Sequence, residues 1–451
     1  MADIAAPVRK PTFFGEPPAL GYLAFTEIWE RFSYYGMTAL LVLYMTQQLF
    51  LPGHVEHVTG FAAFRAGVEA VFGKMSTLAF ASQVNGLYTG LVYATPLLGG
   101  WLADRYIGRR RAVIAGALLM SGGHIAMAFD ASFLLALVLL ITGCGLLKGN
   151  ISAQVGALYP EGDAAGRTRG FSIFSMGINV GATAGPLVCG LLAQVYGWHA
   201  GFGLAGILML LGLATYMAGY RTLTETTPAA NRAQPHAKID ARQWRTIAAL
   251  FGVMALSIFH SIAYYQNSNI GLVWINSQVD LNLLGFQVPV PWFNSIDSFI
   301  SIVFVPPLVW LWRVQARRGG EPNEVVKIAT GAYLAAFANL LLVIGCALGT
   351  RVNAIFPVTY DIILGIAFLY YWPTMLALVS RAAPPAVKAT MMGFVFLTLF
   401  LSNTIIGRLG GLYEQMTPLN FWAMHAAIAA LGGTLALIVN RPLSRVFNNQ
   451  E

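Results

Sequence analysis

Three charged residues lie close together in an early apolar segment of the chain. Glu27, Glu30 and Arg31 occur in the stretch TEIWERFSYYG. In a helix, positions 27, 30, 31, 34 and 38 share one face, so these residues form a polar stripe with Tyr34 and Thr38. One arginine cannot fully neutralise two carboxylates, and one of the two is therefore a candidate to bind and release a proton. The alternative is an internal ion pair that only fastens helices together.

The composition of the chain is that of a membrane protein. Hydrophobic residues make up 57% of its 451 residues and charged residues 10%, and the mean hydropathy is +0.64. A soluble protein carries roughly a quarter charged residues. The net charge of +8 indicates loop charge rather than nucleic-acid binding, because no basic run is interleaved with aromatic residues that could stack on bases. We therefore expect a chain that crosses the lipid bilayer many times and has no nucleic-acid partner.

Twelve apolar segments are long enough to cross a bilayer, which takes about 20 residues in a helix. They are Ala19–Phe50, Leu78–Ala103, Ala112–Phe129, Phe133–Leu158, Gly170–Val195, Gly201–Ala218, Thr246–Ile270, Trp292–Trp312, Val325–Leu348, Phe356–Ser380, Lys388–Leu412 and Asn420–Val439. The stretch Leu51–Thr77 is too polar to span and is predicted to hold a short amphipathic helix near Phe61–Met75.

A polar, basic linker divides these segments six and six. We expect an N-terminal tail (1–19), a six-helix bundle (20–219), a cytoplasmic linker (220–245), a second six-helix bundle (246–440) and a C-terminal tail (441–451). Two bundles around a midplane site are the usual plan of secondary transporters. The two tails and the predicted loops on their side together carry 21 of the 27 lysines and arginines, against 3 on the other side. This bias predicts that both termini are cytoplasmic.

A lone lysine lies deep in the fourth apolar segment. Lys148 is followed by about ten more residues of that segment, which at 1.5 Å per residue places it about 15 Å from the segment's end. At that depth its ammonium group cannot reach water along the lipid face. We therefore expect a buried partner for Lys148.

Several motifs together resemble those of one transporter family. EIWERFSYYG (27–36) matches the ExxERFxYYG signature of the proton-dependent oligopeptide transporters, within the major facilitator superfamily. GGWLADRYIGRRRAV (99–113), GCGLLKGNIS (143–152) and FSIFSMGINVGAT (171–183) are similar to further patterns of that family. The glycines Gly177, Gly181 and Gly185 in the last of these also leave a smooth face where another helix can approach.

The resemblance implies a fold and an activity. The fold would be an all-α membrane protein of the major facilitator type, with twelve transmembrane helices in two six-helix bundles. The protein would be a symporter and not an enzyme, importing di- and tripeptides together with protons by alternating access. It would need no cofactor, because the proton gradient drives it. We expect a monomer in the cell inner membrane whose partners are the peptide, protons and the lipid bilayer.

The resemblance also implies roles for individual residues. Proton coupling would use Glu27, Glu30, Arg31 and Lys148, and Lys148 would also take the peptide's carboxylate. The remaining substrate-binding candidates are Tyr34, Tyr35, Tyr88, Asn179, Trp292, Asn294, Asp297, Phe368 and Trp372. Ion pairs that hold one gated state would involve Asp104, Arg105, Arg109 and Arg110, although plain positive-inside charge would also explain this loop. No metal site is expected.

The second half of the chain departs from the family pattern. The helix 7 carboxylates of the family are absent at Tyr264 and Tyr265, and Phe368 stands where relatives have the glutamate that binds the peptide's amine. The replacements predict an aromatic pocket wall of Tyr264, Tyr265, Trp292, Phe368, Tyr371 and Trp372. Asp297 is then expected to be the only acid in mid-membrane in this half. We predict that it recognises the amine or serves as a second proton site; the alternative is an acid near the outer surface that merely caps or hydrates its helix.

Two alternative functions stay open. The missing glutamate favours a carrier of the same family for another small anionic or zwitterionic substrate, nitrate-like or amino-acid-like. A membrane-embedded enzyme or a channel is disfavoured, because the sequence has no HExxH or GxSxG motif, no cysteine–histidine constellation and no filter-like repeat.

Overall fold

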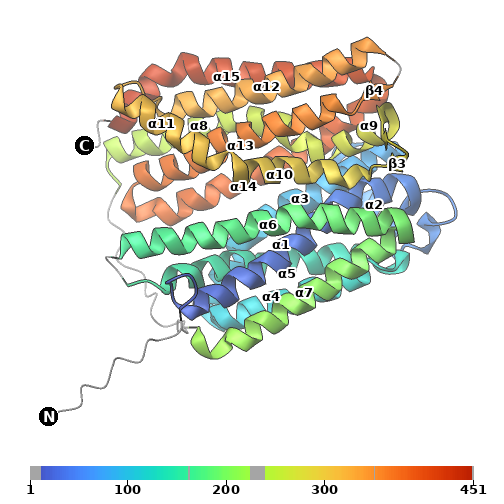
Figure 1. Cartoon of the computed structure of the whole chain (residues 1–451), viewed down its shortest axis with the longest axis horizontal. Coiled ribbons are helices and arrows are strands. Elements are labelled where there is room, and N and C mark those ends of the chain that lie inside the picture. The colour runs from blue at the N-terminus through green and yellow to red at the C-terminus, as the bar shows by residue number, and fades with distance from the viewer. Residues whose placement is uncertain (1–11, 161–162, 224–238, 350, 449–451) are drawn as a thin grey trace.

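Long helices that lie nearly side by side make up most of the computed structural model (Figure 1). It describes residues 12–160, 163–223, 239–349 and 351–448. Most of the predicted N-terminal tail and of the predicted linker lies outside the described residues. The first and the last helix both have their outer ends at the left of Figure 1, near the labels N and C. We call this the basic end, because the arginine-rich turn at 103–111 also lies there, and the opposite end the closed end.

Six long helices form the first half of the described chain. They are α1 (Pro18–Tyr44), α3 (Thr77–Leu102), α4 (Arg109–Ala126), α5 (Phe133–Ala157), α6 (Ala164–Tyr196) and α7 (Trp198–Gly219). The short elements of this half are η1 (Met45–Leu49), η2 (Val55–His57), α2 (Phe61–Phe72), η3 (Ala103–Ile107), η4 (Asp130–Ser132) and η5 (Tyr220–Thr222). The structure thus has a short helix, α2, at the place where the sequence predicts an amphipathic one.

The second half contains six further spans, two of which are broken. The first is α8 (Ala241–Tyr265) with η7 (Gln266–Ser268) and α9 (Ile270–Gln278), and the second is η8 (Val290–Trp292), α10 (Phe293–Val303) and α11 (Val305–Arg317). The others are α12 (Glu324–Leu348), α13 (Ile355–Ala382), α14 (Lys388–Gly410) and α15 (Pro418–Asn448), joined by η9 (Pro385–Val387) and η10 (Gly411–Gln415). Two-residue strands complete the closed end: β1 (Val279–Asp280) pairs in parallel with β4 (Val352–Asn353), and β2 (Asn282–Leu283) pairs antiparallel with β3 (Phe286–Gln287).

Local sequence explains where several helices begin and end. The Ser76 side chain accepts a hydrogen bond from the backbone N–H of Ala79 at the start of α3, and Asp240 forms a capping box with Gln243 at the start of α8. Gly197, whose φ is +89°, separates α6 from α7 in a conformation that side chains other than glycine rarely adopt. These caps satisfy backbone N–H groups that a helix leaves without partners at its first turn.

Hydropathy and length mark most of these helices as membrane spans. In the described part of the chain, eight helices are long and apolar enough to cross a membrane, and the bent pair Val290–Val303 and Val305–Arg317 makes nine. The three remaining long helices are α1, α3 and α4. Of these, α1 carries the three charges of the polar stripe and α4 begins with three arginines. Counted together, the described helices give the twelve spans that the sequence predicts.

Two boundaries differ from the predicted segments. The span predicted at Trp292–Trp312 bends by 43° between α10 and α11, because Pro306 and Pro307 cannot donate backbone hydrogen bonds to the helix before them. The last helix was expected to end near Val439, but α15 continues to Asn448 and contains Pro442. Part of the predicted C-terminal tail is therefore helical.

The two halves meet along two seams. At the α3–α14 seam the chains are close over a long distance: a Cβ on Gly86 would lie 2.9 Å from the Cα of Gly407, and one on Gly393 would lie 2.7 Å from Leu97. The α6–α10 seam is tight near the closed end, where a Cβ on Gly190 would lie 2.7 Å from the ring of Pro291. Toward the basic end the second seam opens into a groove, which is described below.

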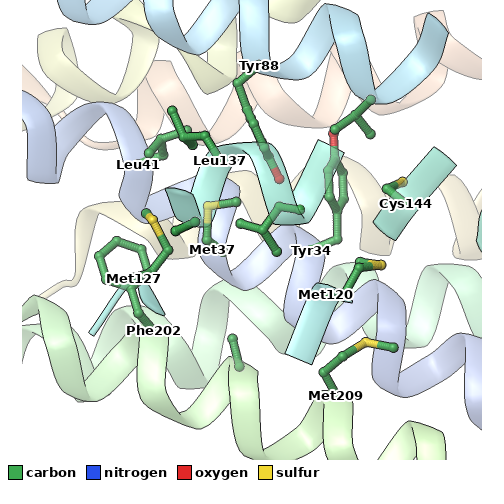
Figure 2. Packing of buried hydrophobic residues seen from close by; sticks show 14 of the residues in the cluster. Tyr34, Met37, Leu41, Tyr88, Met120, Met127, Leu137, Cys144, Phe202 and Met209 are labelled. Atoms are coloured by element: carbon green, nitrogen blue, oxygen red, sulfur yellow. The ribbon is translucent and has the colours of Figure 1, made fainter. Parts of the chain in front are cut away.

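A continuous apolar core fills the first half. Figure 2 shows part of it, where Tyr34 and Met37 of α1 lie among side chains from α3, α4 and α5. Tyr88 and Cys144 belong to the same cluster, and both are almost fully buried. The polar stripe of α1 is thus built into the packed interior of the bundle.

Candidate functional site

The charged residues of α1 form one buried cluster. The Nε of Arg31 lies 3.0 Å from Glu27 Oε1 and also pairs with the Glu30 carboxylate. Each of the three residues is at most 2% exposed. The arginine also lies over the Tyr34 ring, with Cζ 5.5 Å from the ring centre. Thr38 does not extend the cluster, because its hydroxyl donates to the backbone carbonyl of Tyr34, 2.7 Å away.

Helix α6 supports this cluster through its glycines. A Cβ on Gly181 would lie 2.7 Å from Arg31 Cβ and 2.8 Å from the backbone N of Phe32, and still closer to the carbonyl oxygen of Ile28. Gly185 meets the same helix one turn further on. These glycines therefore have the packing role that the sequence predicts. The helix that packs against them is α1, which carries the charged cluster.

Lys148 lies beside the cluster and contacts aromatic rings. Its Nζ is 4.3 Å from the ring centre of Tyr93 on α3 and 5.9 Å from that of Tyr34. Within the described residues it has no carboxylate partner within 4 Å, since the ion pairs found there do not include it. The buried partner that the sequence predicts is thus a pair of tyrosine rings, which attract an ammonium group through their π faces.

Aromatic side chains connect Lys148 to the second half of the molecule. Tyr93 lies 6.4 Å from Tyr265 of α8 between ring centres, and Tyr265 lies 4.8 Å from Tyr264. Tyr264 stacks on Phe368 of α13 at 5.6 Å. Three of the predicted wall residues therefore come together opposite the charged cluster. Tyr35 of α1, half-buried, packs edge-on against Tyr34 at 5.1 Å.

Asp297 is buried in this second half. It is 8% exposed, and its Oδ2 accepts a hydrogen bond of 2.6 Å from the Tyr264 hydroxyl. Its Oδ1 accepts a longer one, of 3.3 Å, from Ser298. This burial excludes the reading in which Asp297 only hydrates the start of its helix.

A second acid was missed by the sequence analysis. Asp361 lies in α13, is 2% exposed and interacts electrostatically with Asp297. The expectation that Asp297 is the only acid in mid-membrane in this half is therefore wrong. A signal was available, because Asp361 lies five residues inside the apolar segment that the sequence predicts from Phe356. Tyr93 was also missed, and nothing in the sequence separates it from tyrosines that only pack.

Other candidates lie apart from the charged cluster. The Trp292 indole donates to the backbone carbonyl of Leu187 on α6, 2.8 Å away, so it fastens the two halves near the closed end. Trp372 packs edge-on against Phe396 of α14. Asn294 is half-buried in the first turn of α10. Among the ring contacts and hydrogen bonds of the described residues, none joins these three directly to the tyrosines around Lys148, although Trp372 contacts Tyr371 at 6.1 Å.

Asn179 lines a groove between the halves. The groove has a volume of about 600 Å³ and is open; α6 lines it from Arg167 to Asn179, and Ser301, Ile302 and Val305 line the other side. It lies on the basic side of the tight α6–α10 contact. At the closed end, in contrast, the Ser82 hydroxyl donates to the carbonyl of Gly407 and accepts from the Asn269 amide, at 3.0 and 2.7 Å.

The arginine-rich turn contains one clear ion pair. Arg109 Nε lies 3.0 Å from Asp104 Oδ1, both partly exposed. Arg105 lies over Tyr106, and Arg110 lies over the ring of Tyr220 at the end of α7. The turn therefore links η3, the start of α4 and the end of α7, and its predicted gating role stays a prediction.

Comparison with known proteins identifies the family. The sequence pattern described as the POT family matches residues 110–239 and 233–422. The uncharacterized transporter YclF of Bacillus subtilis is 30% identical over 497 residues, covering 97% of this chain and 96% of that protein. The chain belongs to the POT family. This confirms the family that the sequence motifs resemble, and this member is a membrane transporter rather than an enzyme.

Relatives and solved structures extend the match over the whole chain. The peptide transporter YePEPT of Yersinia enterocolitica and a di-/tripeptide transporter of Lactococcus lactis are each 28% identical, covering 98% of this chain and 97% and 98% of those proteins. A crystal structure of the peptide transporter POT with sulfate has a TM-score of 0.85 at 27% identity and covers 97% of each chain. A variant with alafosfalin has a TM-score of 0.84 at 28% identity and covers 98% of each. The predicted major facilitator fold, with twelve transmembrane helices in two six-helix bundles, is thereby confirmed.

Proposed function

We propose that this POT-family transporter is a proton-coupled symporter that imports di- and tripeptides by alternating access. It would act as a monomer in the cell inner membrane, with the basic end and both termini in the cytoplasm. The observation that carries the proposal is the buried α1 cluster, in which one arginine pairs with two carboxylates. The names of the relatives and the alafosfalin bound to a similar structure support a peptide as the substrate.

Charge balance supplies the coupling. With both carboxylates ionised, Glu27, Glu30, Arg31 and Lys148 sum to zero charge. A peptide carboxylate that binds Lys148 adds a negative charge, which is costly in a water-excluded site unless a proton binds as well. A proton on Glu27 or Glu30 restores neutrality. Peptide and proton therefore favour each other's binding, as symport requires.

Lys148 is placed to receive that carboxylate. Its ammonium contacts only the faces of Tyr93 and Tyr34 among the contacts described above, so a substrate does not first have to break an ion pair. Tyr34, Tyr35 and Tyr88 would shape this side of the pocket. The amine of the peptide would face Asp297 across the aromatic chain, and Asn179, Asn294, Trp292, Phe368 and Trp372 would contact the rest of the substrate or close over it.

The position of the groove between α6 and α10–α11 supports an assignment of the side of the membrane to which this conformation is open. It opens toward the basic end, while Ser82, Asn269 and Gly407 join the halves at the other end. In the proposed orientation the structure is therefore inward-facing. A proton and a peptide would enter after the closed end parts and leave through the groove.

Uptake into proteoliposomes with an imposed pH gradient tests the proposal. We expect accumulation of labelled dialanine, competed by other di- and tripeptides. Glu27→Gln and Glu30→Gln should each abolish proton-driven uptake while the protein stays folded, and some exchange without a gradient can survive. Robust driven accumulation by either variant would remove that residue from coupling.

A second candidate substrate class is favoured by one observation. Phe368, which stands in place of the family's amine-binding glutamate, packs against Tyr264 and offers no charge. A small anion such as nitrate, or a free amino acid, would not need that glutamate. Uptake of labelled nitrate or a labelled free amino acid, compared with uptake of dialanine, separates the two: driven accumulation of either, with none of dialanine, would replace the peptide proposal.

A further inference from the structure

Asp361 and Asp297 are two buried acids on neighbouring helices, and the mechanism above uses this pair only in part. They come from α13 and α10, which meet so closely that a Cβ on Gly365 would lie 2.7 Å from the backbone oxygen of Asp297. Ser301 Oγ also donates to the Gly365 carbonyl at 3.4 Å. Two carboxylates in one water-excluded place cannot both be ionised at low cost. The pair must therefore bind a proton, or a cation, in the state described here.

The described residues that interact with the two acids carry no positive charge. The groups that face the pair are Tyr35 of α1, Tyr264 of α8, Asn267 of η7, Ser298 of α10 and Tyr360 of α13. Across the described ranges, no lysine, arginine or histidine forms an ion pair with either acid. A proton is then what remains to neutralise it.

The two acids differ in their hydrogen bonds. Asp297 accepts from two hydroxyl groups, those of Tyr264 and Ser298, which suits an ionised carboxylate. The Asn267 side chain interacts with Asp361, whose Oδ2 has no hydrogen-bond partner among the described residues. The hydroxyl of Tyr360, 2% exposed, is likewise without a partner there, and it interacts electrostatically with both acids. Oδ2 of Asp361 is therefore the atom best placed to carry the proton.

Asn267 ties Asp361 to the closed end. It lies in η7, the break between α8 and α9, and the next two residues of that break contact α3 in the other bundle. The Asn269 amide donates to Ser82 Oγ at 2.7 Å, and the Asn85 amide donates to the Ser268 carbonyl at 3.4 Å. One short break thus joins Asp361 on one side to the contacts that close the transporter on the other.

We propose that Asp361 is a second proton-binding residue, separate from the α1 carboxylates, and that its protonation holds the α8–α9 break in the geometry that closes this end. A proton from the outer water binds Oδ2 while the end is open, forming an O–H bond. The neutral acid then tolerates burial beside Asp297, and the break can settle against α3. An ionised Asp361 beside Asp297 instead favours the open, hydrated state. This inference deepens the proposed function and rests on it for the direction of proton movement.

The test measures the closed end directly and needs no substrate. Spin labels are placed through non-natural amino acids at Leu51 and Leu284, exposed residues at the closed end of the two halves, and their distance is measured in nanodiscs from pH 8 to pH 5. One proton bound more tightly in the closed state changes the closed-to-open ratio by up to about tenfold per pH unit. We expect that ratio to rise at least about tenfold in the unsubstituted protein, and the rise to persist when Glu27→Gln and Glu30→Gln are combined.

Matched variants assign the effect. Asp361→Asn, which mimics the protonated acid, should remain closed at both pH values, whereas Asp280→Asn, at an exposed acid of the same end, should behave as the unsubstituted protein. If Asp361→Asn does not fold, Asn267→Ala keeps the carboxylate and removes its link to the break, and should reduce the pH response at least about threefold. An unchanged pH response in Asp361→Asn or in Asn267→Ala would overturn the proposal.

Two outcomes separate this proposal from others. If the distances respond to pH through Asp361 but no peptide is accumulated, the proposed substrate fails and the proton site stands. If Asp361→Asn keeps the normal pH response and loses only the preference for a dipeptide over the same dipeptide acetylated at its amine, the pair recognises the amine and the gate role is overturned.

Discussion

Gly181 allows the sharpest test of how α6 supports the charged cluster. Substituting alanine adds one methyl group at the point where α6 crosses α1. That methyl would lie 2.7 Å from Arg31 Cβ and 2.8 Å from the backbone N of Phe32. Both neighbours belong to α1 near the helix backbone, so neither can rotate out of the way. The helices must separate instead.

The expected separation and its cost follow from these distances. The carbonyl oxygen of Ile28 would lie closer still, and ordinary contacts begin near 3.4 Å, so α1 must move by about 1 Å relative to α6. Overpacking of this kind costs about 1–3 kcal/mol. Alanine is about 1 kcal/mol better than glycine within a helix, which offsets part of that cost. The change in unfolding free energy therefore needs a control that gains the same propensity without the clash.

Gly203 provides that control. It lies within α7, and no atom would lie within 4 Å of a Cβ built on it. The difference between Gly181→Ala and Gly203→Ala thus isolates the overpacking. At about 2–4 °C per kcal/mol for a unit the size of one bundle, we expect Gly181→Ala to melt roughly 2–12 °C below Gly203→Ala.

Transport should fall by more than stability does. The charged residues of α1 move together with that helix, so the displacement shifts them relative to Lys148 on α5. A displacement near 1 Å can cost about a hundredfold where groups must be positioned, so we expect at least about a tenfold loss of proton-driven uptake. Melting is measured in detergent, and uptake in proteoliposomes at matched protein content. Equal melting temperature and equal uptake in the two variants would show that α6 does not constrain the cluster.

Three further predictions concern other contacts. Lys148→Ala should lose proton-driven uptake with little change in melting temperature, because the lysine makes only ring contacts; normal driven uptake would give it a structural role. Asp130→Asn should lower the melting temperature by several degrees. Asp130 accepts a hydrogen bond from Tyr44 at 2.5 Å and pairs with His54 and His199 at 3.0 and 2.9 Å, and losing such contacts costs about 1–3 kcal/mol. An unchanged melting temperature would mean that this cluster adds nothing to stability. The hydrogen bond from Arg65 lowers the pKa of Glu69 below its ordinary 4.5, so the ionised carboxylate stabilises this loop above pH 4.5 and that stability is lost as the pH falls through the lower folded value. The protection factor of the Met75 amide, which donates to Glu69, should then fall on acidification, and a constant protection factor from pH 5 to pH 3 would contradict this.

Much of the fold could be predicted from hydropathy. Runs of about 20 apolar residues mark the spans, because a bilayer leaves the backbone no partner outside the helix itself. The break between α8 and α9 could not be predicted in this way. It depends on Asn267 and Asn269, whose side chains bond to residues distant in the sequence, Asp361 and Ser82. Only the folded chain shows that these partners exist.

The candidate site was predicted less evenly. The α1 cluster follows from spacing alone, because Glu27, Glu30 and Arg31 are neighbours on any helix. Lys148 was correctly expected to have a buried partner. That this partner is aromatic could not be predicted, because it depends on the position of Tyr93 on another helix. Asp361 was overlooked because an acid a few residues inside an apolar run looks like the edge of a span. Its burial depends on α10 and on Asn267 of η7, which pack against α13 in the folded chain.

The unequal seams of the molecule have a mechanical consequence. Along α3 and α14 the helices are in close contact from Gly86 to Leu97, whereas α6 packs closely on the second half near Pro291 and borders the groove toward the basic end. We therefore expect the α3–α14 seam to act as the hinge when the two halves rotate relative to each other. The α6–α10 seam, on the far side, would then open. In the proposed mechanism the substrate would leave through the groove, along α6 and past Arg167. Larger side chains introduced along the α3–α14 seam would change the angle between the opened halves without contacting the substrate.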